Sequence, residues 1–157
     1  MLLPSAELGD GEAAANLVTL HLEDGDLSGA AEYAERYADE ERPDTLVALA
    51  EVRAAQRRHD EAEALFRRAG ELGALRAHTA YGTFLRTVRN DPVGAEREYR
   101  AARRHREPGW AWTLARFLVD EGRADEARPY LEYAAVRGDR AAAGLLAELD
   151  GEDPHDD

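Results

Sequence analysis

Two sequence motifs recur along the chain at the same spacing, and this periodicity constrains the fold more than any other feature. The first is a leucine or tyrosine next to a smaller residue, with a large apolar residue three positions after it. The second is an alanine with apolar or small residues four and seven positions later. The first begins 32, 32, 33 and 32 residues apart, at Leu17, Leu49, Tyr81, Leu114 and Leu146. The second begins 32, 33 and 32 residues apart, at Ala30, Ala62, Ala95 and Ala127. Two independent motifs with one period predict a chain built from repeats.

Within each motif the apolar residues lie three, four and seven positions apart, which places them on one face of an α-helix. Each repeat is therefore predicted to be two short amphipathic helices. The chain contains 31 alanines, and alanine on a contact face lets two helices approach closely. We predict an all-α protein with helices at 11–23, 27–40, 43–57, 60–72, 75–89, 92–106, 109–121, 124–137 and 139–149.

Helix-starting and helix-breaking residues agree with these ranges. Asp26 and Asp91, the latter followed by a proline, are expected to cap the helices that begin after them. Pro43 and Pro108 are expected to open the first helices of two repeats. Pro129 does not fit this pattern, because it lies inside a predicted helix and should bend that helix or delay its start.

These residues resemble the tetratricopeptide repeat, a helix pair that starts with W-x-x-L-G-x-x-Y and finishes with A-x-x-x-F-x-x-A. Residues 60–69 match the finish fully, and the repeats beginning at Ala95 and Ala127 match it closely. Tyr81-Gly82 and Leu114-Ala115 match the leucine–glycine position. The departures are a unit of 32 to 33 residues in place of 34, and Leu46, His78 and Ala111 where the family has its first tryptophan. Sel1-like repeats are also similar, but their units are longer.

The resemblance implies a right-handed α-solenoid of about four repeats over residues 11–149, closed by a solvating helix at 139–149. We expect this solenoid to be a single domain, preceded by a flexible lead-in at 1–10 and followed by an acidic disordered tail at 150–157. A helix pair this short cannot bury its apolar face alone, so stacking of repeats would form one continuous core. The resemblance also implies a concave face, lined by the first helix of each repeat, that binds an extended peptide or a helix of another protein.

Counting from the motifs places the concave positions of three repeats. Four of them, Arg76, Arg86, Arg116 and Trp112, would form a basic and aromatic strip on an acidic protein, suited to an acidic peptide with an apolar anchor. The alternative is that the arginines form ion pairs within the protein. Trp110 is expected to pack towards the preceding helix pair and Trp112 to face the groove, unless both are wedged between helices. The expected concave positions are Asp44, Val47, Glu51 and Ala54, then Arg76, Thr79, Thr83 and Arg86, then Trp112, Arg116 and Val119.

One known binding mode of the family does not carry over. Its carboxylate clamp holds the end of a peptide with lysine and asparagine side chains, but this chain has no lysine. Asn16 is the one matching residue, and Val47, Glu51, Thr79 and Thr83 stand at other clamp positions. We therefore do not expect binding of a peptide carboxylate of this type.

Other functional classes have little support in the sequence. The arginine-rich segment 97–106 is interrupted by Glu98 and flanked by Glu96 and Glu107, and the net charge is −13, which disfavours nucleic acid. The five histidines lack the spacing that places two ligands on one helix face. We find no glycine-rich phosphate loop and no nucleophile motif. We expect no enzyme activity, no cofactor and no metal.

Composition also limits the cellular compartment and the class of protein that the sequence predicts. The chain has no cysteine, which removes disulfides and thiol chemistry. No apolar run approaches the roughly 18–20 residues of a membrane span, and Met1-Leu2-Leu3-Pro4 lacks the pattern of a signal peptide. The sequence therefore predicts a cytoplasmic scaffold or adaptor that binds another protein. The alternatives are a self-associating, homodimeric structural module and a regulatory helper subunit of an enzyme.

Overall fold

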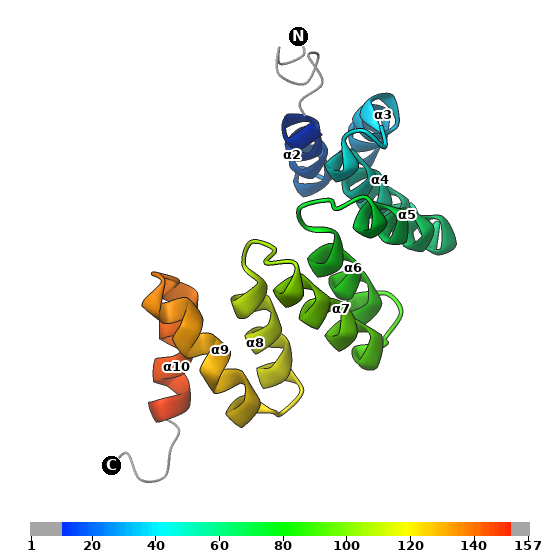
Figure 1. Cartoon of the computed structure of the whole chain (residues 1–157). Helices are drawn as coiled ribbons and strands as arrows, with labels where there is room; N and C mark the ends of the chain where they lie inside the picture. Colours follow the sequence, from blue (N-terminus) through cyan, green and yellow to red (C-terminus); the bar gives the residue numbers. More distant parts are fainter. Residues whose placement is uncertain (1–10, 152–157) are drawn as a thin grey trace. The chain divides into compact units, whose positions relative to one another are not determined.

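The computed structural model describes residues 11–151, and this part of the chain is all-α, as predicted. Figure 1 shows the helices in chain order. The predicted ranges agree with the observed ones to within three residues at each end. The second helices of the predicted pairs begin at residues 27, 59, 92 and 124, with the 32- to 33-residue spacing of the alanine motif. The helices are α2 (Gly11–Glu23), α3 (Leu27–Tyr37), α4 (Pro43–Ala55), α5 (His59–Glu71), α6 (Ala77–Thr87), α7 (Pro92–Arg104), α8 (Trp110–Asp120), α9 (Ala124–Val136) and α10 (Arg140–Gly151).

The two predicted aspartate caps are present. The side-chain oxygens of Asp26 and Asp91 each accept a hydrogen bond, 2.9 Å long, from the backbone N–H three residues later. Asp139 caps α10 in the same way, with 3.0 Å to the N–H of Ala142. Each of these bonds satisfies a donor in the first turn that has no partner within its own helix.

The predictions made for the prolines agree with the structure only in part. Pro43 is the first residue of α4, as expected. Pro108 does not open a helix: it lies in the turn before α8, which starts at Trp110 after Gly109 in the left-handed conformation (φ 74°). The predicted delay at Pro129 is also wrong, because α9 begins five residues earlier, at Ala124.

The carboxyl-terminal helix is longer than expected. It continues to Gly151, two residues beyond the predicted end at 149. The first two residues of the predicted tail at 150–157 are therefore helical. The rest of that tail, and the predicted lead-in at 1–10, lie outside the described residues.

The chain divides into two compact units between Ala95 and Glu96, within helix α7. In unit 1, α2 packs with α3 and α4 packs with α5. The first helices of successive pairs also touch there, α2 against α4 and α4 against α6. In unit 2, α8 packs with α9, and α9 packs with α10. The single domain expected over residues 11–149 stays a prediction.

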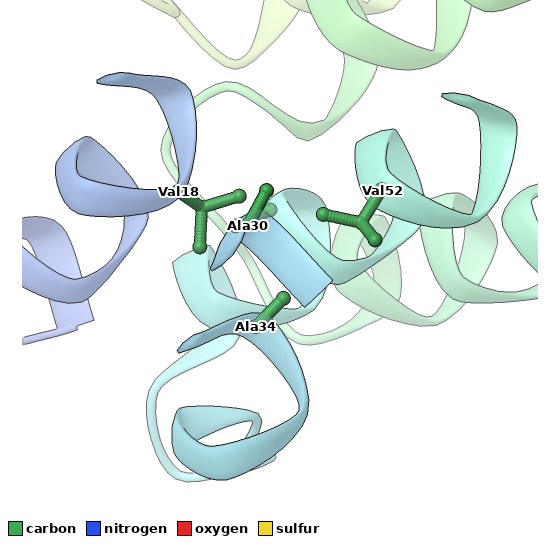
Figure 2. Packing of buried hydrophobic residues seen from close by; sticks show 5 residues of the cluster. Val18, Ala30, Ala34 and Val52 are labelled. Carbon is green, nitrogen blue, oxygen red and sulfur yellow. The ribbon is translucent and has the colours of Figure 1, made fainter. Parts of the chain in front are cut away.

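The repeated alanines occupy the positions of closest packing. The alanine that leads each second motif is completely buried, at positions 30, 62, 95 and 127. Figure 2 shows one such site, where Ala30 and Ala34 of α3 lie beside Val18 of α2 and Val52 of α4. A larger side chain at these alanines would push the helices apart, because protein interiors are close-packed.

Aromatic residues join successive helix pairs at equivalent positions in the two units. In unit 1 the rings of Phe66 and Phe84 lie 5.3 Å apart, and in unit 2 those of Tyr99 and Phe117 lie 5.5 Å apart. Both pairs are separated by 18 residues in the sequence. In each pair, the second motif of one repeat meets the first motif of the next, so the two units share one packing rule.

Candidate functional site

Unit 1 contains a hollow of about 800 Å³ between its first helices. Residues of α2, α4 and α6 line it, together with Phe66 of α5 and the loop that leads into α6. The volume is within the range of small-molecule and peptide pockets. The repeat resemblance implies a concave face lined by the first helices, and that assignment stays a prediction for this hollow.

Apolar side chains form much of its lining. Val47, Phe66 and Phe84 are buried at its inner side. Leu75 stands at its edge with 51% of its surface exposed. Such a lining can cover an apolar side chain of a ligand, and the removal of apolar surface from water would drive its binding.

Threonines on α2 and α6 also line the hollow, and three of their hydroxyls donate hydrogen bonds within their own helices. The hydroxyl of Thr19 donates to the carbonyl of Ala15, and that of Thr87 donates to the carbonyl of Thr83, one turn earlier in each helix. Thr83 does the same with Thr79. These hydroxyl donors are satisfied within the protein, so an apolar ligand group can lie beside them without breaking a hydrogen bond.

The charged residues of the lining are mostly acidic. Within the described chain, three carboxylates and one guanidinium line the hollow: Glu23, Asp44, Glu51 and Arg76. Asp44 also has a structural role, because its Oδ1 accepts a 2.8 Å hydrogen bond from the backbone N–H of Leu75 and so ties α4 to the loop before α6. The hollow therefore carries a net negative charge.

Glu51 is the residue whose ionisation is affected most clearly in this hollow. Its side chain is exposed to the hollow, yet the concave walls replace much of the water around it. This desolvation raises the pKa of Glu51 above its ordinary value of 4.5, while the charge of Arg76 lowers it in part. A cation in the hollow would favour the ionised form of Glu51 and would itself be stabilised.

The structure brings together some of the predicted site residues. Arg76, Thr79 and Thr83 line the hollow, as do the expected positions Asp44, Val47, Glu51 and Ala54. Arg86 is half-buried near the end of α6 and is not part of the lining. Trp112 and Arg116 belong to unit 2, where Trp112 is half-buried and exposed Arg116 pairs with Asp120 at 3.4 Å. Whether these residues bind a partner stays a prediction.

Trp110 packs differently from the expectation. Its ring contacts Tyr130 and Tyr133 of α9, with ring centroids 5.9 and 5.0 Å away. The guanidinium of Arg103, from α7, lies 5.6 Å from its centroid. Trp110 therefore packs chiefly against the second helix of its own pair and only in part towards the preceding one. Helix periodicity predicted which face of the helix carries Trp110, but it did not predict which neighbouring helix packs against that face.

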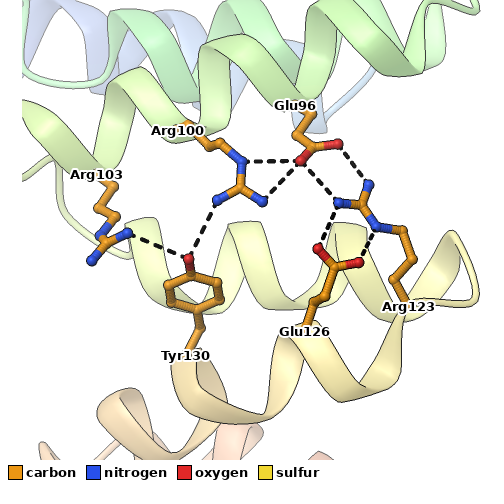
Figure 3. A network of polar contacts seen from close by, with 6 residues as sticks. All are labelled: Glu96, Arg100, Arg103, Arg123, Glu126 and Tyr130. Atoms are coloured by element: carbon orange, nitrogen blue, oxygen red, sulfur yellow. Dashed lines mark hydrogen bonds and ion pairs between the residues drawn. The ribbon is translucent and has the colours of Figure 1, made fainter.

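A polar network joins α7 to the start of α9 within unit 2, as Figure 3 shows. The carboxylate of Glu96 accepts from Arg123 at 2.6 Å and from Arg100 at 3.0 Å. Arg123 also donates to Glu126 at 2.6 Å. These hydrogen bonds, those from Arg123 first, hold the pKa values of Glu96 and Glu126 below their ordinary range. Arg100, the residue of the arginine-rich segment that pairs with Glu96, is thus neutralised inside the protein.

Sequence reasoning missed several residues of the hollow. Thr19, Leu22 and Glu23 contribute from α2, on which the sequence indicates only Asn16 as a groove position, and Asn16 also lines the hollow. Leu75 and Phe66 come from a loop and a second helix. The packing of second helices behind the groove is a tertiary feature with no signal in the periodicity.

Two further observations concern function more broadly. None of the helices in the described chain combines the length and apolar character of a bilayer span. Within residues 11–151, no group of three or more histidines and carboxylates is arranged to hold a metal ion. No known protein-family model matches the chain, and comparison with curated proteins finds no match.

Proposed function

We propose that the protein is a tetratricopeptide-like repeat solenoid that binds a segment of another protein in the hollow of unit 1. Support for the repeat comes from the spacing of the helices, the buried alanines and the equivalent aromatic pairs of the two units. The contacts of α2 with α4 and of α4 with α6 are those expected of stacked first helices. The observation that carries the functional proposal is the hollow itself, whose lining combines apolar side chains with three carboxylates.

The lining indicates the chemistry of the bound segment. An apolar floor selects a segment that presents apolar side chains on one side, as an amphipathic helix does. Glu23, Asp44 and Glu51 outnumber Arg76, so charge complementarity favours lysine or arginine on that segment. This preference differs from the acidic partner expected from sequence, which required Arg86, Trp112 and Arg116 in the same groove.

No catalytic step is part of this proposal. The polar groups of the hollow include Asn16, Arg76, three carboxylates and several threonines. Three of the threonine hydroxyls donate to carbonyls of their own helices. These groups suit recognition of a ligand by shape and charge. We therefore propose binding, with no change to the bound segment.

Calorimetric titration with two designed peptides tests the proposal. The cationic peptide has twelve residues, three leucines on one helical face and four lysines on the other. In the acidic peptide, glutamates replace the lysines. We expect the full chain to bind the cationic peptide, and Glu51→Gln to weaken this binding roughly fivefold, the effect of one partly screened charge pair.

Glu32→Gln is the matched control, because Glu32 is an exposed carboxylate on α3 outside the hollow. It removes the same charge and should change the affinity by less than twofold. Equal losses in the two variants would show that only the net charge of the protein matters. The absence of heat for the cationic peptide at millimolar concentration would contradict the proposed binding.

A further inference from the structure

A cluster of two arginines and three aromatic residues lies on unit 2 and shares no residue with the hollow of unit 1. Its members, here called the arginine–aromatic patch, are Arg103, Trp110, Tyr130, Tyr133 and Arg137. The guanidinium of Arg103 lies 5.6 Å from the Trp110 centroid and 5.4 Å from the Tyr130 centroid. That of Arg137 lies 3.5 Å from the Tyr133 centroid. Trp110 connects the two ends, because its ring packs on both tyrosines.

The two arginines of the patch keep their positive charge unneutralised. Some other arginines of unit 2 face carboxylates, such as Arg123 with Glu96 and Arg128 with Asp150. Within the described residues, by contrast, Arg103 and Arg137 contact aromatic rings and neutral oxygens. Arg103 donates to the Tyr130 hydroxyl at 3.4 Å, and Arg137 donates to the Tyr133 carbonyl at 3.1 Å. Cation–π contact orients a guanidinium but leaves its charge available to an anion.

The patch also presents apolar surface to solvent. The ring of Tyr133 is 38% exposed, and Val136, between Tyr133 and Arg137 on α9, is 84% exposed. Tryptophan, tyrosine and arginine are the residues that most often dominate the binding energy of protein interfaces. Side chains already held in place by their neighbours lose less freedom when a partner binds.

We infer that the arginine–aromatic patch is a second docking surface, and that its partner is an acidic segment of another protein with an apolar side chain. Carboxylates of that segment would pair with Arg103 and Arg137, and its apolar side chain would cover Tyr133 and Val136. A nucleic acid fits less well, because its repeated phosphates need an extended basic face, whereas this patch offers two guanidiniums on a chain whose net charge is −13. This inference is independent of the hollow of unit 1, whose charge has the opposite sign.

The acidic and cationic peptides described above serve as probes for the full chain. By calorimetry we expect the acidic peptide to bind at low ionic strength. Arg103→Gln combined with Arg137→Gln should weaken this binding at least tenfold. Arg97→Gln should weaken it by less than twofold, because Arg97 is an exposed arginine on α7 outside the patch. The cationic peptide should bind the double variant as it binds the wild type, which separates this surface from the hollow.

Tryptophan fluorescence locates the bound peptide. The chain has two tryptophans, so Trp112→Phe leaves Trp110 as the reporter. We expect its emission to change with the acidic peptide along the same curve as the heat, and circular dichroism checks that this variant is folded. If the variant does not fold, the calorimetric comparison on the wild-type background still tests whether the acidic peptide binds the arginine–aromatic patch.

Four results would overturn the inference. They are no heat with the acidic peptide at millimolar concentration, an equal loss with Arg97→Gln, and tighter binding of a twelve-nucleotide oligothymidylate than of the acidic peptide. The fourth is an affinity for the acidic peptide that rises tenfold when residues 152–157 are deleted. That segment contains four carboxylates, and such a gain would make it, and not a partner, the occupant of the patch.

Discussion

At the scale of single residues, Tyr81 shows how burial and polarity are combined in unit 1. Its ring stacks on Phe66 with centroids 5.8 Å apart. Its hydroxyl donates to Glu63 at 2.6 Å and accepts from Arg67 at 3.1 Å. Glu63 in turn pairs with Arg89 at 3.2 Å. One side chain thus joins the core between α5 and α6 to an ion-pair network at the surface.

Replacement of Tyr81 tests this double role. Tyr81→Phe keeps the ring but removes the hydroxyl bond to a carboxylate, and we expect a loss of about 1–2 kcal/mol in the free energy of unfolding. Urea denaturation at pH 7 measures it. A variant as stable as the wild type would show that the hydroxyl contributes nothing to the folded state.

The same hydroxyl predicts a change of stability in alkaline solution. Burial, and then the bond to Glu63, raise the pKa of Tyr81 to about 12, above the ordinary value of 10. Because the folded protein holds this proton more tightly than the unfolded chain, its contribution is complete below about pH 10. It should disappear as the pH rises from about 10 to about 12. The difference in stability between wild type and Tyr81→Phe should shrink over that range, and a constant difference would contradict the assignment.

Glu51 contributes to the hollow at some expense of stability. Because desolvation raises its pKa, the folded state is favoured when Glu51 is protonated and loses stability as the pH rises through its pKa. Glu51→Gln should therefore be at least as stable as the wild type at pH 7, although it binds the cationic peptide less well. A clear loss of stability in thermal unfolding would indicate that Glu51 serves the fold and not a ligand.

At the scale of helices, the buried alanines set how closely neighbouring elements approach. Ala62 of α5 is fully buried, whereas Ala64, on the same helix, is exposed. The sequence motif alone separated these two alanines, since position 62 recurs at the repeat spacing and position 64 does not. The motif does not predict which neighbouring helix each buried alanine contacts, because that depends on which helix faces meet in the folded protein.

Paired substitutions test this packing. Ala62→Leu should cost about 1–3 kcal/mol, because added volume in a close-packed contact forces α5 away from its neighbours. Ala64→Leu should change stability by no more than about 0.5 kcal/mol. Denaturant unfolding of both variants gives the comparison. Similar effects at the two positions would mean that the repeat motif does not mark the contact face.

Most helix boundaries were predictable because their signals are local. Asp26, Asp91 and Pro43 fix helix starts through one hydrogen bond or one fixed dihedral angle. Pro108 misled the prediction, since the left-handed turn at Gly109 separates it from α8. The sequence also located most of the α4 and α6 positions in the hollow. It did not foresee the acidic balance of the lining or the contacts of Trp110, which depend on how several helices come together.

At the scale of the whole molecule, the net charge of −13 is unevenly divided. The hollow of unit 1 has three carboxylates in its lining, while the arginine–aromatic patch of unit 2 presents two unneutralised guanidiniums. An adaptor with two surfaces of opposite charge can hold two different partner segments, and each surface rejects the other's ligand by like-charge repulsion. We propose that the hollow of unit 1 is a binding groove for a cationic amphipathic segment.

The measurement that tests this claim most directly is the mapping of amide chemical shifts on the ¹⁵N-labelled full chain during titration with the cationic peptide. We expect saturable shifts concentrated at hollow residues such as Glu51, Thr79 and Thr83, with the amides of unit 2 little changed. Saturable shifts confined to unit 2, or none at millimolar peptide, would contradict it.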